Sequence, residues 1–453
     1  MRHHLRMSKR RTYIVFSVAT ALLIGSTVSN VSAAAPKIGS SCKKVGALFD
    51  TPGTRFVCNK EGKKLVWRTW YPAAARNTST SSTATTPAPA QSKTPAAAAT
   101  PSKPLVQNPI PITLPAAQVG TISFENITQH ISDISEAAYN AVQQVEATNT
   151  QPNIPTVVTV GPNTVPAVKD VPAAFKKISK LWSGFRQPVS YYALLYSFQD
   201  KDWALKTAAK TPEVISTGGI QGLTGMMKQC TAANQCSSGN SGIGNEGTYG
   251  AGFGQFGMDP DHIAQDPYFL IGGIFGHEYT HSTQAAQFLD NPNIGKPVTQ
   301  LQNQHGLSNS PSGLYEGALP CWFQEGQANF QGTSAEAATL GDYMRWRLRM
   351  AKGHPIPEFT NYSAASLTNL LLTDNPPTCL PPTPVYQLGY GIGALVIEAL
   401  TAIAGPQSTM AVVTLLGRGQ SYDEAFKNVY DISWAKAAPI LAQVAAVEYA
   451  ATP

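Results

Sequence analysis

A segment that cannot form a core of its own divides this chain. Residues 73–116 consist mainly of alanine, threonine, serine and proline. Such a composition buries too little apolar surface to fold, and its prolines keep the backbone extended. We therefore expect a linker at 73–116, with a small unit before it and a large folded domain over residues 117–453.

The first residues have the pattern of an export signal. A basic stretch, "MRHHLRMSKRR", precedes the apolar run "YIVFSVATALLIGSTV", and "VSA" supplies the small residues that signal peptidase requires. We expect a signal peptide over residues 1–33, cleaved after Ala33. The alternative is an uncleaved anchor, but the apolar run is shorter than the ~20 residues of a spanning helix. Either way the chain is exported, as a secreted or envelope-associated protein, and cleavage leaves no transmembrane segment.

The charge of the chain says little about its partners. Only 13% of the residues are charged, and the formal net charge of +6 arises mostly in the N-terminal region. This distribution does not indicate a nucleic-acid surface on the large domain. A weak attraction to acidic polymers of the cell envelope remains open.

Six cysteines in an exported chain indicate disulfides rather than free thiols. Six cysteines permit 15 pairings, and proximity in sequence favours three of them. The favoured pairs are Cys42–Cys58, Cys230–Cys236 and Cys321–Cys379. A structural zinc cluster would need CxxC-like pairs, which the sequence lacks.

Residues 37–72 have the pattern of a small β module. The runs "TRFVC" and "KKLVWR" flank the turn "NKEGK", which predicts a β-hairpin closed by one disulfide. A unit below ~40 residues needs such a disulfide to fold. The segment resembles small two-cysteine modules of secreted actinobacterial proteins. We expect a spacer or a weak contact with the cell envelope.

The large domain mixes helix and strand patterns. Apolar spacing predicts helices over 124–148 and 172–185, and the β-rich run at 189–198 predicts a strand. The glycine-rich stretch 247–257 fits an edge strand or a loop, and as a strand it could pair with an extended substrate. The chain beyond residue 281 is expected to be mainly helical with long loops.

The stretch "HEYTH" at residues 277–281 carries the main chemical signal. In a helix His277 and His281 lie on one face and can bind one metal ion, of which zinc is typical. Glu278 lies beside the first histidine. There it can act as general base on a zinc-bound water and pass the proton to the leaving amine.

A third metal ligand has to come from elsewhere in the chain. A histidine six residues after His281 is absent, because Gln287 stands there, and no glutamate occurs between Ser282 and Tyr315. Three acidic residues remain as candidates. They are Asp290 in the predicted turn "LDNPN", Glu316 in the predicted loop "LYEGALP", and Glu325 in "PCWFQEGQANF".

Of these three, Glu325 has the most informative surroundings. It is the lone carboxylate of an apolar helix, where a charge is costly unless it is paired or bound to metal. We expect Gly326 and Ala328 to let this helix approach the "HEYTH" helix closely.

These stretches resemble the gluzincin metallopeptidases of the peptidase MA-like group. "FGHEYTHSTQ" followed by "CWFQEGQANF" is similar to the HExxH and W-x-x-E-G-x-A helices of that family, and "VYQLGYGIGALVIEAL" to its Y-x-x-G helix. The resemblance covers most of 117–453, with specific motifs between 275 and 435.

The resemblance implies a thermolysin-like fold of the α+β class, with a small mixed sheet beside the active-site helix and a mainly helical C-terminal half. It implies zinc held by His277, His281 and Glu325, with Glu278 as general base. It further implies that Tyr386 donates a hydrogen bond to the oxyanion of the reaction, with Tyr390 as the second candidate for this role. The expected function is zinc-dependent hydrolysis of peptides or proteins outside the cytoplasm.

Two other functions remain open. One is a non-catalytic envelope protein in which zinc only holds helices together, with a fourth protein ligand such as His305 or Asp290. The other is a zinc amidase that acts on cell-wall material. Zinc-bound water distinguishes the first of these from an enzyme, and substrate profiling distinguishes the second from a peptidase.

Overall fold

The computed structural model describes most of the large domain and part of the N-terminal region. The described residues are 37, 40–44, 48–51, 54–61, 63–69, 114–216, 219–233, 235–244, 250–264, 266–294, 296–297, 309–353, 359–373 and 385–452. The predicted signal peptide and residues 73–113 of the predicted linker lie outside them. The chain divides into two compact units, one of residues 1–51 and 56–68 and the other of 52–55 and 69–453.

The first unit contains a three-stranded sheet in the order β1-β2-β3. The strands are β1 (Leu48–Thr51), β2 (Thr54–Glu61) and β3 (Lys64–Thr69). The neighbours β2 and β3 are the two runs predicted to pair. Cys42 and Cys58 form the predicted disulfide.

A four-stranded mixed sheet forms one side of the second unit, in the order β4-β5-β7-β6. Strands β4 (Thr156–Val160), β5 (Ser190–Tyr196) and β7 (Ala251–Gly257) are parallel, and β6 (Ser238–Ile243) runs antiparallel to β7. The predicted strand at 189–198 is confirmed as β5. The expectation that the glycine-rich stretch forms a sheet edge is wrong, because β7 pairs on both sides and every residue in it is buried.

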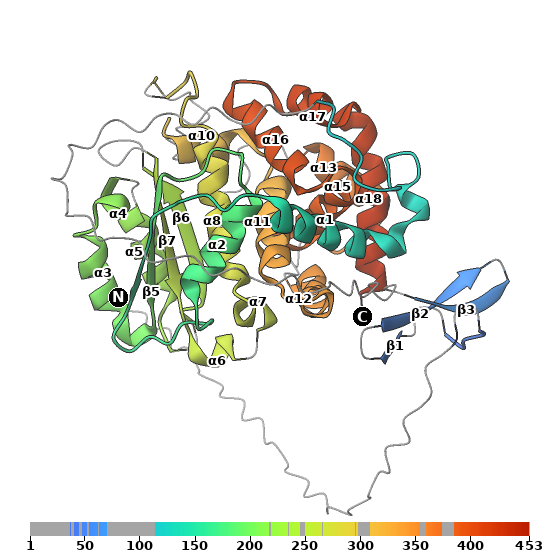
Figure 1. Cartoon of the computed structure of the whole chain (residues 1–453), viewed down its shortest axis with the longest axis horizontal. Coiled ribbons are helices and arrows are strands. Elements are labelled where there is room, and N and C mark those ends of the chain that lie inside the picture. Colours follow the sequence, from blue (N-terminus) through green and yellow to red (C-terminus); the bar gives the residue numbers. More distant parts are fainter. Residues whose placement is uncertain are drawn as a thin grey trace, which may run out of the picture. The chain divides into compact units, whose positions relative to one another are not determined.

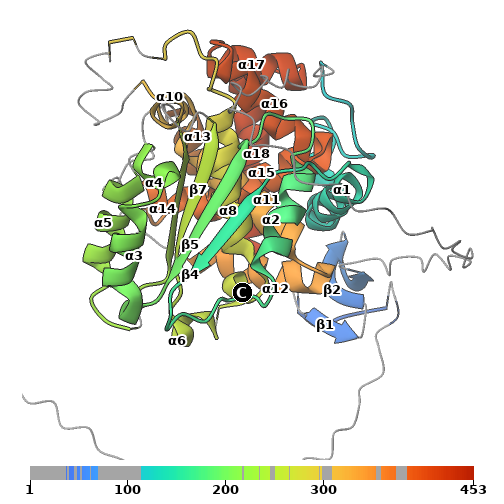
Figure 2. The ribbon, with the colours of Figure 1, turned by 60° about the vertical axis from the view of Figure 1, so that its left-hand side comes forward.

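Helices cover both faces of this sheet (Figure 2). One face packs against α2 (Val171–Leu181) and α8 (Gly273–Ala286). The other packs against α3 (Lys201–Ala208), α4 (Pro212–Ser216) and α5 (Gly219–Gln229), with Leu194, Tyr196 and Phe253 in the core between them. Burial on both faces explains why β5 reads as a continuous apolar run.

The rest of the second unit is helical and packs beyond α8 (Figure 1). Helix α1 (Ile134–Thr148) is shorter than predicted, because two 3₁₀ turns, Ile127–Gln129 and Ile131–Asp133, precede it. The short helices α6 (Pro260–Ile263) and α7 (Pro267–Leu270) lead into α8. The helices after α8 are α10 (Pro311–Ala318), α11 (Cys321–Glu336), α12 (Leu340–Gly353), α13 (Ala364–Thr373), α14 (Val385–Leu388), a π-helical turn (Gly389–Gly393), α15 (Ala394–Ala404), α16 (Pro406–Gly417), α17 (Tyr422–Tyr430) and α18 (Trp434–Ala451). One mixed sheet with a mostly helical remainder agrees with the expected α+β class.

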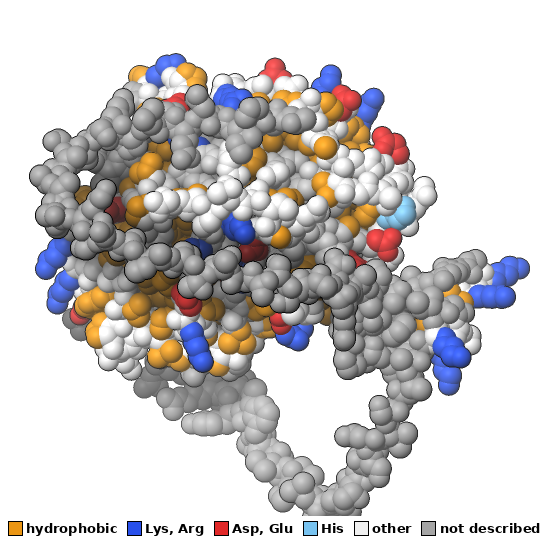
Figure 3. Space-filling model, in the orientation of Figure 1, with side chains coloured by type: hydrophobic (Ala, Val, Ile, Leu, Met, Phe, Trp, Pro, Cys, Tyr) orange, Lys and Arg blue, Asp and Glu red, His pale blue; other side chains and the backbone are white. Residues whose placement is uncertain are grey.

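One helical stretch of this unit, Tyr386–Ala404, is long and apolar enough to cross a membrane by length and composition. However, 89% of its apolar window is buried inside the unit, as in the central helix of a packed core. On the face of the second unit in Figure 3, the coloured Lys and Arg side chains are scattered and form no single large patch.

Disulfides occur in the second unit as well. Cys230 and Cys236 are bonded as predicted and close the turn between α5 and β6. Cys321 is also disulfide-bonded, and Cys379, its predicted partner, lies outside the described residues. These bonds are consistent with an extracellular location.

A buried ionic network joins α12, α15 and α18. The guanidinium of Arg347 lies 2.7 Å from a carboxylate oxygen of Glu398 and 2.7 Å from one of Glu448, and all three side chains are buried. One positive charge cannot balance two buried carboxylates. Burial accordingly raises the pKa of Glu448 to about 8, with Arg347 opposing the rise and Glu398 adding to it.

Glu448→Gln is expected to flatten the pH dependence of stability. Because the pKa of Glu448 is raised on folding, the folded state binds the extra proton, and stability falls as the pH rises from about 4.5 to about 8. Glutamine resembles the protonated acid and removes this loss, which is on the order of a few kcal/mol. Thermal unfolding of wild type and variant in chelator, from pH 5 to 8.5, measures the difference. Parallel curves would contradict the assignment.

Candidate metal centre

Helix α8 presents the "HEYTH" residues inside the molecule. It begins after Gly272, whose positive φ of 84° turns the chain into the helix, and every residue of α8 is buried. His277 and His281, one turn apart, face α11, which carries Glu325. The helix predicted around Glu325 is thus confirmed as α11.

A glycine pair sets the spacing of α8 and α11. A Cβ added to Gly332 would lie 2.4 Å from the backbone nitrogen of His277, and one added to Gly276 would lie 2.6 Å from the carbonyl oxygen of Gly332. The two backbones are therefore in direct contact. The expectation that Gly326 makes this approach is wrong, because Gly326 packs against Gly393 of the π-helical turn.

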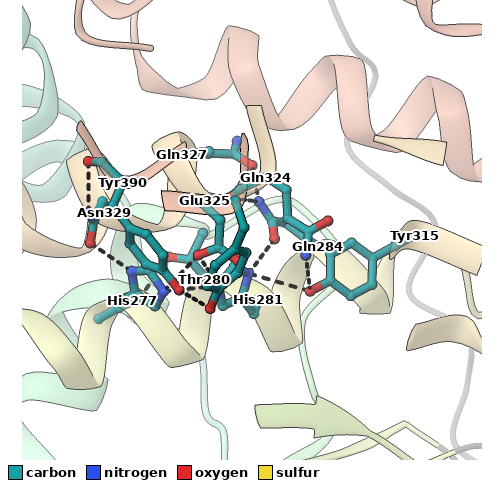
Figure 4. A network of polar contacts seen from close by, with 12 residues as sticks. His277, Thr280, His281, Gln284, Tyr315, Gln324, Glu325, Gln327, Asn329 and Tyr390 are labelled. Carbon is teal, nitrogen blue, oxygen red and sulfur yellow. Dashed lines mark hydrogen bonds and ion pairs between the residues drawn. The ribbon is translucent and has the colours of Figure 1, made fainter. Parts of the chain in front are cut away.

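Three buried ligand atoms converge between the two helices (Figure 4). The Nε2 atoms of His277 and His281 each lie 3.4 Å from Oε2 of Glu325 and 3.0 Å from each other. Two ligands about 2.0–2.1 Å from a tetrahedral zinc lie about 3.3 Å apart. The group therefore fits a metal ion with two nitrogen ligands and one oxygen ligand.

His281 and Glu325 shift each other's pKa strongly. Burial would raise the pKa of Glu325, but the charge of His281 and hydrogen bonds from both histidines outweigh it and hold that pKa far below its usual range. Burial alone would lower the pKa of His281, but Glu325 raises it to about 9.

A cavity of 430 Å³ lies beside the ligand group. Both His277 and Glu278 line this cavity. The Glu278 side chain packs on Gly239 of β6, where an added Cβ would overlap its Oε1 atom. Burial is the main cause that raises the pKa of Glu278. The carboxylate is therefore held next to the cavity without being part of the ligand group.

Two tyrosines from the segment after α13 line the same cavity. The Tyr386 and Tyr390 hydroxyls are hydrogen-bonded to each other, and the Tyr390 ring stacks on His277 with ring centroids 5.8 Å apart. Tyr386 is half-buried, and its ring packs edge-on against that of Tyr390 with centroids 5.2 Å apart. Both hydroxyls are thus near the ligand group, and the Tyr390 ring is in direct contact with one of its histidines.

Comparisons with protein family models, with curated protein sequences and with solved structures return no match. The likeness to gluzincins consequently rests on the motifs in the sequence. The chemistry of the site has to be inferred from this chain's own residues.

The other two acidic candidates lie outside the ligand group. Asp290 is paired with Arg186 at 2.5 Å and is mostly exposed. Glu316 belongs to helix α10 rather than to the predicted loop. It is half-buried, and burial raises the pKa of its carboxyl to about 7. His305 lies outside the described residues.

Sequence reasoning missed the residues behind the two histidines. Asn329 contacts His277 Nδ1 at 2.9 Å, and Gln284 contacts His281 Nδ1 at 2.8 Å. Helical spacing could have found them, since Asn329 is four residues after Glu325 and Gln284 three after His281. An amide side chain in a helix usually faces solvent, so this spacing alone is weak evidence for a contact with a histidine.

Proposed function

We propose that this chain is an exported, zinc-dependent metallopeptidase of the gluzincin type. The observation that carries the proposal is the convergence of His277, His281 and Glu325 beside a cavity that Glu278 also lines. Three protein ligands are typical of catalytic zinc, whereas structural zinc sites have four. Among the described residues, the group has three members, and Asp290 is engaged elsewhere.

The residues of the site take distinct roles in this proposal. Zinc supplies a Lewis acid that polarises the substrate carbonyl and makes water a better nucleophile. Glu278 accepts the proton of the attacking water and delivers it to the leaving nitrogen. Tyr386 donates to the oxygen on which negative charge develops, a contact that stabilises the transition state more than the ground state.

The sheet edge beside the site suits an extended substrate. Among the described strands β6 pairs only with β7, so no described strand occupies its other edge. Ser238 and Gly239 of β6 line the cavity together with Glu278. We assign to β6 the substrate-pairing role that the sequence suggested for residues 247–257.

The cavity walls favour a bulky apolar substrate side chain. Phe269, Trp346 and Met350 line it, and each is at most 5% exposed. Arg349 and Asp266 also line the cavity, and their charged groups lie 3.6 Å apart. The cavity therefore has charged residues beside its apolar ones. A peptide with a large apolar residue next to the cleaved bond fits this lining.

Cleavage of a mixed peptide library by the zinc-loaded full chain tests the proposal. Products are identified by mass spectrometry, with chelator-treated protein as control and with zinc added back. Cleavage that disappears with chelator and returns with zinc is the expected result. No cleavage in any sample, despite one bound zinc per chain, would overturn the peptidase assignment and favour a structural zinc or a cell-wall substrate.

Tyr386→Phe is expected to lower kcat by about 10²–10³, the usual effect of losing one oxyanion donor. Zinc affinity should stay unchanged, because the hydroxyl is not a ligand. Tyr390→Phe keeps the ring on His277 and is expected to cost less than about tenfold. Steady-state kinetics with zinc titrations measure both variants. Equal losses in the two would mean that the tyrosines act as a pair, against the assignment to Tyr386 alone.

A further inference from the structure

Both metal-facing histidines have a carboxamide oxygen at the opposite ring nitrogen. The Oδ1 atom of Asn329 lies 2.9 Å from Nδ1 of His277, and the Oε1 atom of Gln284 lies 2.8 Å from Nδ1 of His281. Asn329 is 4% exposed and Gln284 is fully buried. The Tyr315 hydroxyl lies 3.4 Å from the same nitrogen of His281. Carboxylates and backbone carbonyls are frequent partners at this position, whereas here all the side-chain partners are neutral.

The hydrogen bonds beyond Gln284 determine which way its amide points. Its Nε2 atom lies 3.1 Å from the carbonyl oxygen of Gln324 and 2.8 Å from Oε1 of Gln327. A backbone carbonyl can only accept, so the atom that faces it must be the NH₂ group. The Gln284 oxygen therefore faces His281, whose Nδ1 must be the donor.

The chain of bonds continues to α16 in the same direction. Gln327 donates from Nε2 to the Thr409 hydroxyl at 2.8 Å, and that hydroxyl donates to the carbonyl of Pro406 at 2.7 Å. Each group uses its donor on the next acceptor, and the last acceptor is again a backbone carbonyl. No member of this arm is able to reverse without placing two acceptors face to face.

The arm behind His277 is shorter and equally directed. Asn329 donates from Nδ2 to the carbonyl of Tyr390 at 2.9 Å, so its oxygen faces His277 Nδ1. Tyr390 belongs to the π-helical turn. Both arms thus end on carbonyls supplied by the helices that follow α11. The contacts from the two histidines as far as Gln327 and Tyr390 can be followed in Figure 4.

We propose that these two arms form a carboxamide relay that selects the metal-binding form of both histidines. In neutral histidine the relay holds the proton on Nδ1, which leaves the lone pair on Nε2. The two Nε2 atoms and the Glu325 carboxylate then present three acceptors to one point, at separations of 3.0–3.4 Å, and a cation is the group that satisfies them. Gln327 acts only through Gln284 and is a positioning residue. This inference rests on the metal site of the proposed function, not on its reaction.

Zinc affinity of the metal-free full chain, measured by competition with a chromophoric chelator, tests the relay. Gln327→Leu is expected to weaken zinc binding about 10-fold, because Gln284 loses the bond that orients it and His281 thereby loses its outer partner. Gln331→Leu is the matched control. Gln331 lies one turn further along α11, is fully buried and donates to Thr401 at 3.0 Å, a bond of the same kind that leads to neither histidine.

The expected result is a loss of zinc affinity in Gln327→Leu and a change of less than about twofold in Gln331→Leu, at similar cost in thermal stability. Equal zinc affinity in Gln327→Leu and wild type would overturn the relay. If the leucine variants do not fold, Thr409→Val replaces Gln327→Leu and Thr401→Val replaces the control Gln331→Leu. Each removes the hydroxyl that accepts the glutamine's hydrogen bond. The same loss of zinc affinity is then expected in Thr409→Val and not in Thr401→Val. Zinc affinity is measured without substrate, so failure to cleave peptides would overturn the proposed reaction and leave the relay standing.

Discussion

Glu278→Gln is expected to lower peptide hydrolysis by about 10²–10⁴ or more while zinc remains bound. Glutamine has the same shape as glutamate but cannot accept the proton of the attacking water. Because Glu278 is outside the ligand group and its side chain packs on Gly239, the substitution leaves the three ligands in place. The loss should therefore appear in kcat and not in zinc content.

The measurement pairs kinetics on a cleaved library peptide with zinc analysis of the same preparation. Glu316→Gln is the matched control, since it neutralises another carboxyl close to His281 that does not line the cavity. It is expected to retain activity within a few-fold. Full activity in Glu278→Gln would exclude Glu278 as the general base, and loss of zinc in that variant would mean that Glu278 also holds the ligand group together.

Gly332→Ala is expected to destabilise the domain and weaken its metal site together. The new methyl group would lie 2.4 Å from His277 N and 2.6 Å from the carbonyl carbon of Gly276, both backbone atoms that cannot rotate away. Helices α8 and α11 must separate to admit it. Overpacking of this kind costs about 1–3 kcal/mol, and separation of the helices moves Glu325 away from both histidines.

Thermal unfolding and zinc titration of Gly332→Ala measure the two effects. Gly225→Ala, in the exposed part of α5, is the matched control, because nothing lies within 4 Å of its added Cβ. Alanine is the better helix former by roughly 1 kcal/mol, so this control should be neutral or stabilising. A Gly332→Ala protein with wild-type unfolding temperature and zinc affinity would show that the close contact does not set the ligand spacing.

The sequence was most informative where the chemistry is local. The helix that carries His277 and His281, the helix that carries Glu325 and strand β5 can each be predicted from short patterns, and the two histidines had to share a face at a spacing of four. Proximity also predicted two disulfides correctly. In each case the residues that define the feature lie close in the chain, at most 16 positions apart.

Features that depend on tertiary contacts could not be predicted in this way. Strand β6 reads "SGNSGI", which has few β-branched or aromatic residues, and only pairing with β7 makes it a strand. The choice of Gly332 over Gly326 as the contact with α8 depends on how two helices cross. Likewise, the bond from Gln327 to Thr409 joins residues 82 positions apart.

The direct contact of Gly276 with Gly332 makes metal binding and folding parts of one equilibrium. A chain in which α8 and α11 have come apart has lost the ligand geometry, so the zinc of our proposal would bind the folded state in preference to the unfolded one. By mass action, free zinc at about 100 times its dissociation constant would add about 2.7 kcal/mol to the free energy of unfolding. The amount of free zinc in the surroundings would thereby set the fraction of chains that are folded, independently of the rate of the proposed reaction.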